Sequence, residues 1–165
     1  MAGWSGFGGV KLGHFKNAMT CLNYNRPTVA ASALGVAQGA LDMALAYAKE
    51  RKQFGRAIGE FQAVGFMLAD MQIQIEAARA LLYKVTDMAD RGDTARFAEM
   101  ASIVKTFAAD TAMKVTTDAV QVFGGAGYLV ETGVERLMRD AKVTQIYEGT
   151  GQIQRVIISR AMMAR

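Results

Sequence analysis

Apolar residues recur at steps of three and four over most of the chain, and this period predicts amphipathic helices. The most regular stripe runs from Phe61 to Val85 and suits antiparallel helix packing. We expect helices over residues 28–52, from Phe61 to a turn at 91–93, from an N-cap at Asp93 or Thr94 to the glycines at 124–127, and over about 134–143 and 150–164. Three long helices with short connections, followed by C-terminal helices, predict an all-α fold, an up-and-down four-helix bundle.

The chain begins differently from the rest. Glycines interrupt any helical period over residues 1–14, which we interpret as a flexible tail or linker stub. Residues 15–165 then form a single predicted domain. A short helical turn is expected at residues 15–22. Pro27 is expected in the first turn of the next helix, where its missing N–H costs nothing.

Glycines also mark the predicted connections. Gly55 and Gly59 indicate a connection after the first long helix, with no alternating stretch that would predict a strand. Gly92 is typical of a helix C-cap, and Asp93 or Thr94 is typical of the next N-cap.

Composition narrows the class of protein. A hydrophobic share of 52% with 21% charged residues excludes a disordered chain. The net charge of +4 is scattered and predicts no nucleic-acid partner. The single cysteine, Cys21, excludes a disulfide framework, and no metal site is expected. We expect no membrane insertion, because no apolar run reaches the roughly 18 residues that a spanning helix needs. The sequence therefore predicts a soluble intracellular domain.

Glu148 is the best candidate for chemistry. It lies between the last two predicted helices, before a glycine and the potential N-cap Thr150. One interpretation is a capping acid that complements the positive end of a helix dipole. The other is a general base on a loop that faces a cleft, where burial against an apolar substrate would favour proton abstraction.

Two further segments also allow two interpretations. The glycine-rich segment at 124–127 is either a helix terminator or a set of backbone N–H groups for a phosphate. The segment at 50–55, with Arg51 before Phe54, is either a solvated helix end or a site that holds a pyrophosphate or a stacked base.

Taken together, the motifs resemble the C-terminal domain of the acyl-CoA dehydrogenase family of flavoenzymes, over about residues 15–165. The matching segments occur in the family's order. They are RP at 26–27, LGVAQGALD at 34–42, YAKERKQFG at 47–55, FQ at 61–62, QVFGGAGY at 121–128, VERLMRDAK at 134–142, QIYEGT at 145–150 and QIQR at 152–155. The Arg-Pro pair is similar to the medium-chain and short-chain branch.

The resemblance implies a reaction and a catalytic residue. In the family, the glutamate that matches Glu148 removes the α-proton of an acyl-CoA thioester while the β-hydrogen leaves as hydride to FAD, which gives a trans-2-enoyl-CoA. Polarisation of the thioester carbonyl by hydrogen bonds makes the α-proton acidic, an oxyanion-hole effect. Some relatives place the base beside the residue matching Arg26, but Asn25 stands there and cannot act as a base.

The resemblance also assigns binding roles by position. The residues that match FAD contacts are Arg51, Phe54, Gln62, Gln121, Val122, Phe123, Gly124, Gly125, Thr150 and Gln152. Those that match the substrate region are Arg26, Tyr147 and Gly149. Since FAD is shared between subunits in the family, a homodimer or homotetramer is implied. Electrons would then pass to an electron-transfer flavoprotein, in the cytoplasm of a bacterium or the mitochondrial matrix of a eukaryote.

The family's N-terminal helical domain and middle β domain have no counterpart in this sequence. We therefore expect the isolated chain to show little dehydrogenase activity and weak or no FAD binding. Two alternatives stay open: a non-catalytic helical module that self-associates, from a truncated or degenerate paralogue, and an acyl-CoA oxidase-like relative that passes electrons to oxygen.

Overall fold

The computed structural model describes residues 13–165, and their side chains from residue 17 onward. The predicted tail falls mostly on residues 1–12, which lie outside the described residues, whereas Gly13 already begins the first helix. The long elements are α1 (Gly13–Glu50), α2 (Gln62–Asp90), α3 (Phe97–Phe123), α4 (Val134–Thr144) and α5 (Gly151–Met163). The short ones are β1 (Lys52–Gln53), β2 (Arg56–Ala57) and three 3₁₀ helices at Ile58–Glu60, Gly124–Tyr128 and Val130–Thr132.

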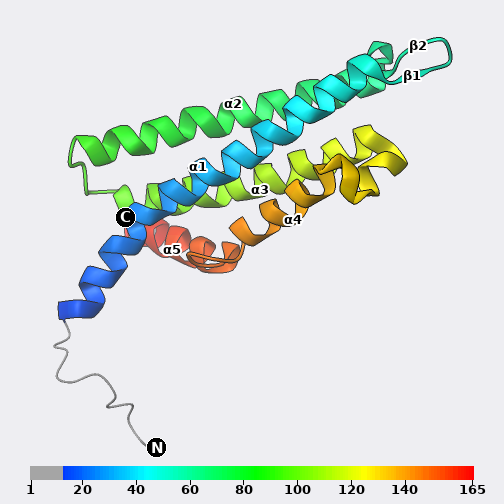
Figure 1. The fold of residues 1–165 in the computed structure, drawn as a ribbon. Helices are drawn as coiled ribbons and strands as arrows, with labels where there is room; N and C mark the ends of the chain where they lie inside the picture. Colours follow the sequence, from blue (N-terminus) through cyan, green and yellow to red (C-terminus); the bar gives the residue numbers. More distant parts are fainter. Residues whose placement is uncertain (1–12) are drawn as a thin grey trace, which may run out of the picture.

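The helices α1 to α4 run up and down beside one another, so the predicted bundle is confirmed (Figure 1). Helix α3 is the central element, since it packs against each of the other four. Its apolar stripe supplies much of the core together with the alanine-rich face of α1 and the regular stripe of α2. Helix α5 packs on α3 outside the four-helix arrangement, at the end where α3 begins (Figure 1).

The start of α1 differs from the prediction. The helix is continuous from Gly13 to Glu50, so Pro27 lies in its interior and not in its first turn. An interior proline removes a backbone hydrogen bond and costs about 3 kcal/mol in a helix. Arg26 and Pro27 are both buried, however, and tertiary packing outweighs the local preference.

A small β-hairpin follows α1, where we predicted a connection without strands. Lys52 pairs with Ala57 and Gln53 with Arg56 across a two-residue turn. The turn residues Phe54 and Gly55 have φ of +53° and +81°, the left-handed pair that a tight hairpin turn requires. The strands are too short for alternation to reveal them, and only the Phe-Gly dipeptide could have signalled the turn.

The connection from α2 to α3 agrees with the prediction only at its start. Gly92 ends α2 with φ of +66°, as expected for a residue after a helix C-terminus. Helix α3 begins later than predicted, with Arg96 as its N-cap residue in place of Asp93 or Thr94. No side chain caps this end, and the prediction of an Asp or Thr cap is wrong.

Helix α1 also corrects the expectation that no apolar stretch is long enough to span a membrane. Residues Asn17–Glu50 are long and apolar enough to cross a membrane by length and composition alone. In the bundle, however, the alanine-rich face of this helix is buried against the other helices, as in the core helix of a globular protein. We therefore treat α1 as a core helix.

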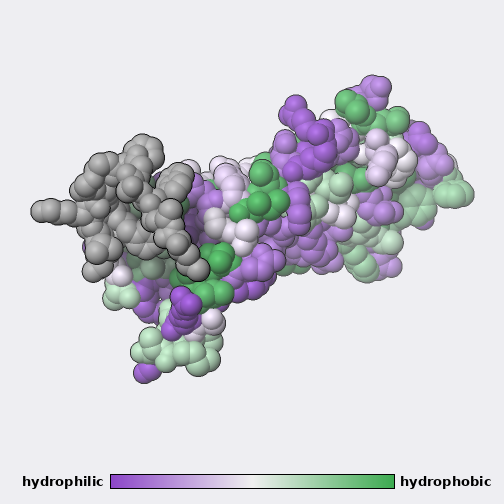
Figure 2. Space-filling model, turned by 90° about the horizontal axis from the view of Figure 1, so that it is seen from below, coloured by the Kyte–Doolittle hydropathy of each residue, from purple (hydrophilic) through white to green (hydrophobic). Residues whose placement is uncertain are grey.

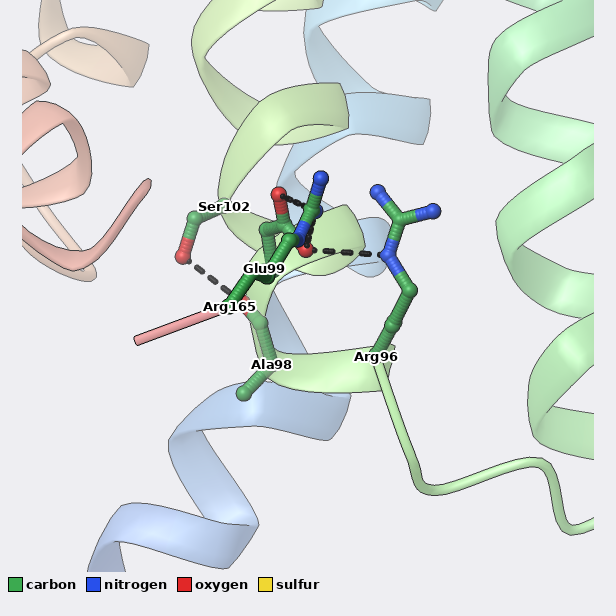
Figure 3. Close-up of polar contacts among 5 residues, drawn as sticks. All are labelled: Arg96, Ala98, Glu99, Ser102 and Arg165. Carbon is green, nitrogen blue, oxygen red and sulfur yellow. Dashed lines mark hydrogen bonds and ion pairs between the residues drawn. The ribbon is translucent and has the colours of Figure 1, made fainter. Parts of the chain in front are cut away.

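The end of the chain is tied to the start of α3. Arg165 donates to both carboxylate oxygens of Glu99, which is only 7% exposed, and Arg96 donates to the same carboxylate (Figure 3). The Ser102 hydroxyl, one turn further along α3, donates to the carbonyl of Ala98 (Figure 3). The contacts of Arg165 fix the end of the chain, just after α5, against the bundle.

Candidate active site

Glu148 lies on the short loop between α4 and α5, and both ends of this loop are closed by hydrogen bonds. The backbone N–H of Gly151 donates to the carbonyl of Gln145 at 3.0 Å. The Thr150 hydroxyl accepts from the N–H of Ile153 at 3.3 Å, so Thr150 is the N-cap of α5. The cap predicted from the sequence is confirmed.

The backbone at Glu148 is in an unusual conformation. Glu148 has φ of +53° and Gly149 has φ of +91°, so two successive residues are left-handed. This region is uncommon for a residue with a Cβ and costs roughly 1–2 kcal/mol. At Gly149 a Cβ would lie 2.6 Å from Nε2 of Gln154, so a side chain there would displace the Gln154 amide.

Two fully buried side chains hold this turn from the bundle side. Nζ of Lys105, on α3, donates to the Gly149 carbonyl at 2.8 Å. Nε2 of Gln154, on α5, donates to the carbonyls of Glu148 and Gly149, both at 3.0 Å. Polar groups at full burial require such partners, and these contacts set the course of the loop.

Arg26 brings a second buried cation to the same end of the bundle. It is 3% exposed on α1, and it donates to the hydroxyl of Ser102 at 3.3 Å and to the side chain of Asn23. Burial lowers the pKa of Arg26, and the nearby Glu148 carboxylate partly offsets this effect. Burial and the charge of Arg26 lower the pKa of Lys105 in turn.

The carboxyl group of Glu148 is half-buried and takes no part in capping. Its Oε2 atom is inaccessible to solvent and has no hydrogen-bond partner among the described residues. Thr150 caps α5, so the interpretation of Glu148 as the capping acid is not supported. A buried carboxylate oxygen without a partner, on a strained turn, is typical of a functional site.

A polar hollow of about 340 Å³ lies beside the loop. Asp110 on α3 organises it by accepting from Gln145 at 2.7 Å and from Arg155 at 2.8 Å. Thr150 and Gln152, two of the predicted flavin contacts, line this hollow. Tyr147 is 41% exposed on the loop next to Glu148.

Most of the remaining predicted cofactor residues lie at the other end of the bundle. An open groove of about 470 Å³ is lined by Arg51 after α1 and by Val122, Phe123, Gly124 and Gly125 at the end of α3. The ring of Phe123 stacks on Tyr47 with centroids 4.1 Å apart, and this stack forms one wall. The segment at 124–127 is part of a 3₁₀ helix after α3, so it does terminate the helix as well as line the groove.

Three of the predicted cofactor residues line neither this groove nor the hollow beside the Glu148 loop. Phe54 is at the tip of the hairpin and 93% exposed, with an edge contact to Phe61 at 6.2 Å between ring centroids. Gln62 is exposed at the first position of α2, and Gln121 is exposed in the last turn of α3. The structure therefore brings Arg51 and residues 122–125 together but leaves these three at the surface.

Apolar side chains surround the Glu148 loop at the surface. Seen from below, the molecule carries hydrophobic groups among hydrophilic ones (Figure 2). Along α4, the loop and α5 the exposed members are Val143, Ile146, Tyr147, Ile153 and Val156. A loop with a partly buried carboxylate and apolar neighbours suits an acid–base group that acts on an apolar compound.

The sequence analysis missed Lys105, Gln154 and Asp110. Lys105 gave a signal, because it lies on the apolar stripe of the third helix between Ala101 and Ala108, where a lysine is unexpected. Gln154 gave a weaker one, as a polar residue on the buried side of the last helix. Asp110 gave none. Among the described residues, no group of His, Cys, Asp or Glu could hold a metal.

Comparison with known proteins agrees with this geometry. The family model described as "Acyl-CoA dehydrogenase, C-terminal domain" matches residues 15–163. Probable acyl-CoA dehydrogenase FadE25 of Mycobacterium tuberculosis is 59% identical over 150 residues, which are 90% of this chain and 38% of that protein. The chain therefore belongs to the acyl-CoA dehydrogenase family and matches its C-terminal domain.

Solved structures show the same fold. Butyryl-CoA dehydrogenase from Megasphaera elsdenii superposes with a TM-score of 0.87 at 50% identity, over 90% of this chain and 38% of that one. A chain in a structure reported for the electron transferring flavoprotein of Acidaminococcus fermentans gives a TM-score of 0.88 at 54% identity, over 92% of this chain and 39% of that one. The chain thus spans about two fifths of the length of these relatives.

Proposed function

We propose that this chain is the C-terminal part of an FAD-dependent acyl-CoA dehydrogenase in which Glu148 is the base. The observation that carries the proposal is the Glu148 carboxyl group, whose Oε2 atom is buried without a partner among the described residues, on a strained turn. Its position in the family motif and the 59% identity to a probable acyl-CoA dehydrogenase support the same assignment. Acyl-CoA dehydrogenases are flavoproteins, and FAD when bound supplies the acceptor for the hydride that leaves the β-carbon.

The role of Glu148 follows from simple proton chemistry. The carboxylate takes the α-proton of the acyl thioester, the electron pair left on the α-carbon forms the new double bond, and the hydride leaves the β-carbon. A carboxylate that is not engaged in an ion pair is free to accept this proton, and none of the described ion pairs involves Glu148. Its N–H, held at φ of +53°, would polarise the thioester carbonyl, as the resemblance implies.

The proposed FAD contacts form two groups that are far apart on one chain. Arg51 and residues 122–125 line the groove at the end of α3, whereas Thr150 and Gln152 line the hollow that Asp110 organises. Along α3, the 13 residues from Asp110 to Phe123 span about 20 Å at 1.5 Å per residue. This separation supports a cofactor shared between two copies, and hence the proposed homodimer or homotetramer. An electron-transfer flavoprotein is the proposed electron acceptor.

A chimera tests the proposal directly. Residues 15–163 of this chain replace the matching part of FadE25, so that the product carries every segment of that full-length relative. We expect the chimera to be yellow with bound flavin and to oxidise an acyl-CoA with a dye or an electron-transfer flavoprotein as acceptor. Glu148→Gln should lower kcat at least about 10³-fold with flavin retained, because the α-proton then has no base.

The matched control is Glu131→Gln, which removes a carboxylate from an exposed position on the 3₁₀ helix that precedes α4. It should leave kcat within about twofold. A Glu148→Gln chimera that oxidised acyl-CoA at the parent rate would refute the assignment of the base.

A further inference from the structure

Lys105 is a buried cation that the proposed chemistry does not use. Its side chain is fully buried on the apolar face of α3, between Ala101 and Ala108. Lysine is almost never found at full burial without a partner. No carboxylate lies within ion-pair distance of Nζ in the described part of the chain, and its hydrogen-bond acceptor is the Gly149 carbonyl. The burial of this cation is therefore explained by the turn that it contacts.

That turn needs to be held. Glu148 and Gly149 are both left-handed, and a strained conformation persists only where its surroundings determine it. Three hydrogen bonds reach their two carbonyls, one from Lys105 and two from Gln154. The bond from Lys105 has a charged donor, and such bonds are about twice as strong as neutral ones. It also joins the loop to α3, the central helix of the bundle, whereas Gln154 joins it only to the adjacent α5.

We propose that Lys105 is a positioning residue whose ammonium group fixes the left-handed Glu148–Gly149 turn and thereby aims the Glu148 carboxylate. The role of this orientation in catalysis rests on the proposed function. The stabilisation of the Glu148–Gly149 turn by Lys105 does not. Charges on three elements face this group: Arg26 on α1, Asp110 on α3 and Glu148 on the loop.

The test uses the full 165-residue chain with the substitution Lys105→Met, which keeps most of the length of the side chain and removes its charge and donors. The matched control is Lys114→Met on the same helix, where the half-exposed lysine pairs with Asp118. Folding is expected to survive Lys105→Met, because the Gly149 carbonyl still accepts from Gln154. Lys105→Gln provides a second variant with a shorter neutral donor.

Two measurements report on the turn itself. Amide hydrogen exchange in residues 146–152 should become about tenfold to a hundredfold faster in Lys105→Met, the effect of losing one bond from a charged donor. The three-bond coupling between the amide and α protons of Glu148, which depends on φ, should move away from its value in the unsubstituted chain. A general loss of stability would speed exchange throughout α3 without changing this coupling.

The outcomes separate the inference from the proposed function. Faster exchange confined to the loop, with a changed coupling at Glu148, supports the positioning role even if the chimera proves inactive. Unchanged coupling and loop exchange in both Lys105 variants, or an equal effect of Lys114→Met, would overturn it. Neither measurement depends on bound FAD or on turnover.

Discussion

Arg165 donates to both carboxylate oxygens of Glu99, at 2.6 and 2.7 Å, and so joins the end of the chain to the first turn of α3. Arg96 adds a third hydrogen bond to the same carboxylate at 3.1 Å. Hydrogen bonds from Arg96 and Arg165 lower the pKa of Glu99. This anchor directly follows α5, the helix that begins beside the Glu148 loop.

The first prediction concerns acid stability. A carboxyl group with a lowered pKa in the folded state stabilises the fold above its unfolded pKa, about 4.3 for glutamate. That stabilisation is lost as the pH falls below about 4.3 and through the lowered value. Glu99→Gln should therefore be less stable than the unsubstituted chain at about pH 6, and the two urea midpoints should converge as the pH falls below about 4.3.

Arg165→Met removes two of the three hydrogen bonds and should weaken this pH dependence in part. Arg160→Met, which removes an exposed arginine from the last helix, is the matched control and should not change it. A constant difference in midpoint between Glu99→Gln and the unsubstituted chain across this acidic range would contradict the prediction.

The second prediction concerns Gly149. An alanine there would be strained at φ of +91°, and its Cβ would lie 2.6 Å from Nε2 of Gln154. The strain costs about 1–2 kcal/mol. Displacing Gln154 leaves buried carbonyls with fewer partners and costs about 1–3 kcal/mol more. Gly149→Ala should lower the free energy of unfolding by the sum of these costs, measured by urea denaturation.

Gly55→Ala is the control for strain alone, because Gly55 has φ of +81° but no atom lies within 4 Å of the position that a Cβ would take there. It should show only the loss of about 1–2 kcal/mol. Equal destabilisation by the two substitutions would mean that Gln154 does not hold the turn.

The third prediction concerns the groove at the end of α3. A Cβ on Gly127 would lie 2.7 Å from the Val120 carbonyl oxygen and 2.8 Å from Cβ of Phe123. Gly127→Ala should therefore cost about 1–3 kcal/mol through overpacking and should shift Phe123 off the Tyr47 ring. We expect a lower Tm, a changed near-ultraviolet circular dichroism signal and weaker flavin retention in the chimera.

Gly125→Ala provides the comparison, since no atom lies within 4 Å of the Cβ position at Gly125. Its unfolding free energy should stay within about 0.5 kcal/mol of the unsubstituted chain. A Gly127→Ala chain with unchanged Tm and aromatic signal would show that this turn has more room than the structure gives it.

The sequence predicts α1, α2 and α3 well because each of these three buries a long apolar stripe, as the run from Phe61 to Val85 does. The prediction is wrong where tertiary packing outweighs a local preference and where an element is too short to show a pattern. Pro27 lies inside a helix because tertiary packing outweighs its local preference, and the Phe54–Gly55 hairpin is too short to show alternation. The family motif identified Glu148, but the partners that hold its loop come from other helices.

Lys105 shows most clearly which contacts cannot be predicted from the sequence. Its position on an apolar stripe could be read from the sequence, but its acceptor, the Gly149 carbonyl, is 44 residues away. Backbone carbonyls have no residue-type signature, so no spacing or motif can pair them with a donor. Most residues of the candidate site could therefore be identified from the sequence, but the contacts among them could be established only from the structure.

The last prediction concerns alkaline pH. Burial and the charge of Arg26 lower the pKa of Lys105 in the folded state, against about 10.4 for an ordinary lysine. Between the lowered value and about 10.4 the unfolded chain holds a proton that the folded chain has released, so the free energy of unfolding rises with pH. Below this window Lys105 is protonated in both the folded and the unfolded chain, so the free energy that its burial costs does not change with pH. Relative to Lys105→Met, the unsubstituted chain should therefore gain stability as the pH rises through this window toward about 10.4, measured by urea midpoints. A gap between the two chains that did not change with pH would show that Lys105 titrates alike in the folded and unfolded states.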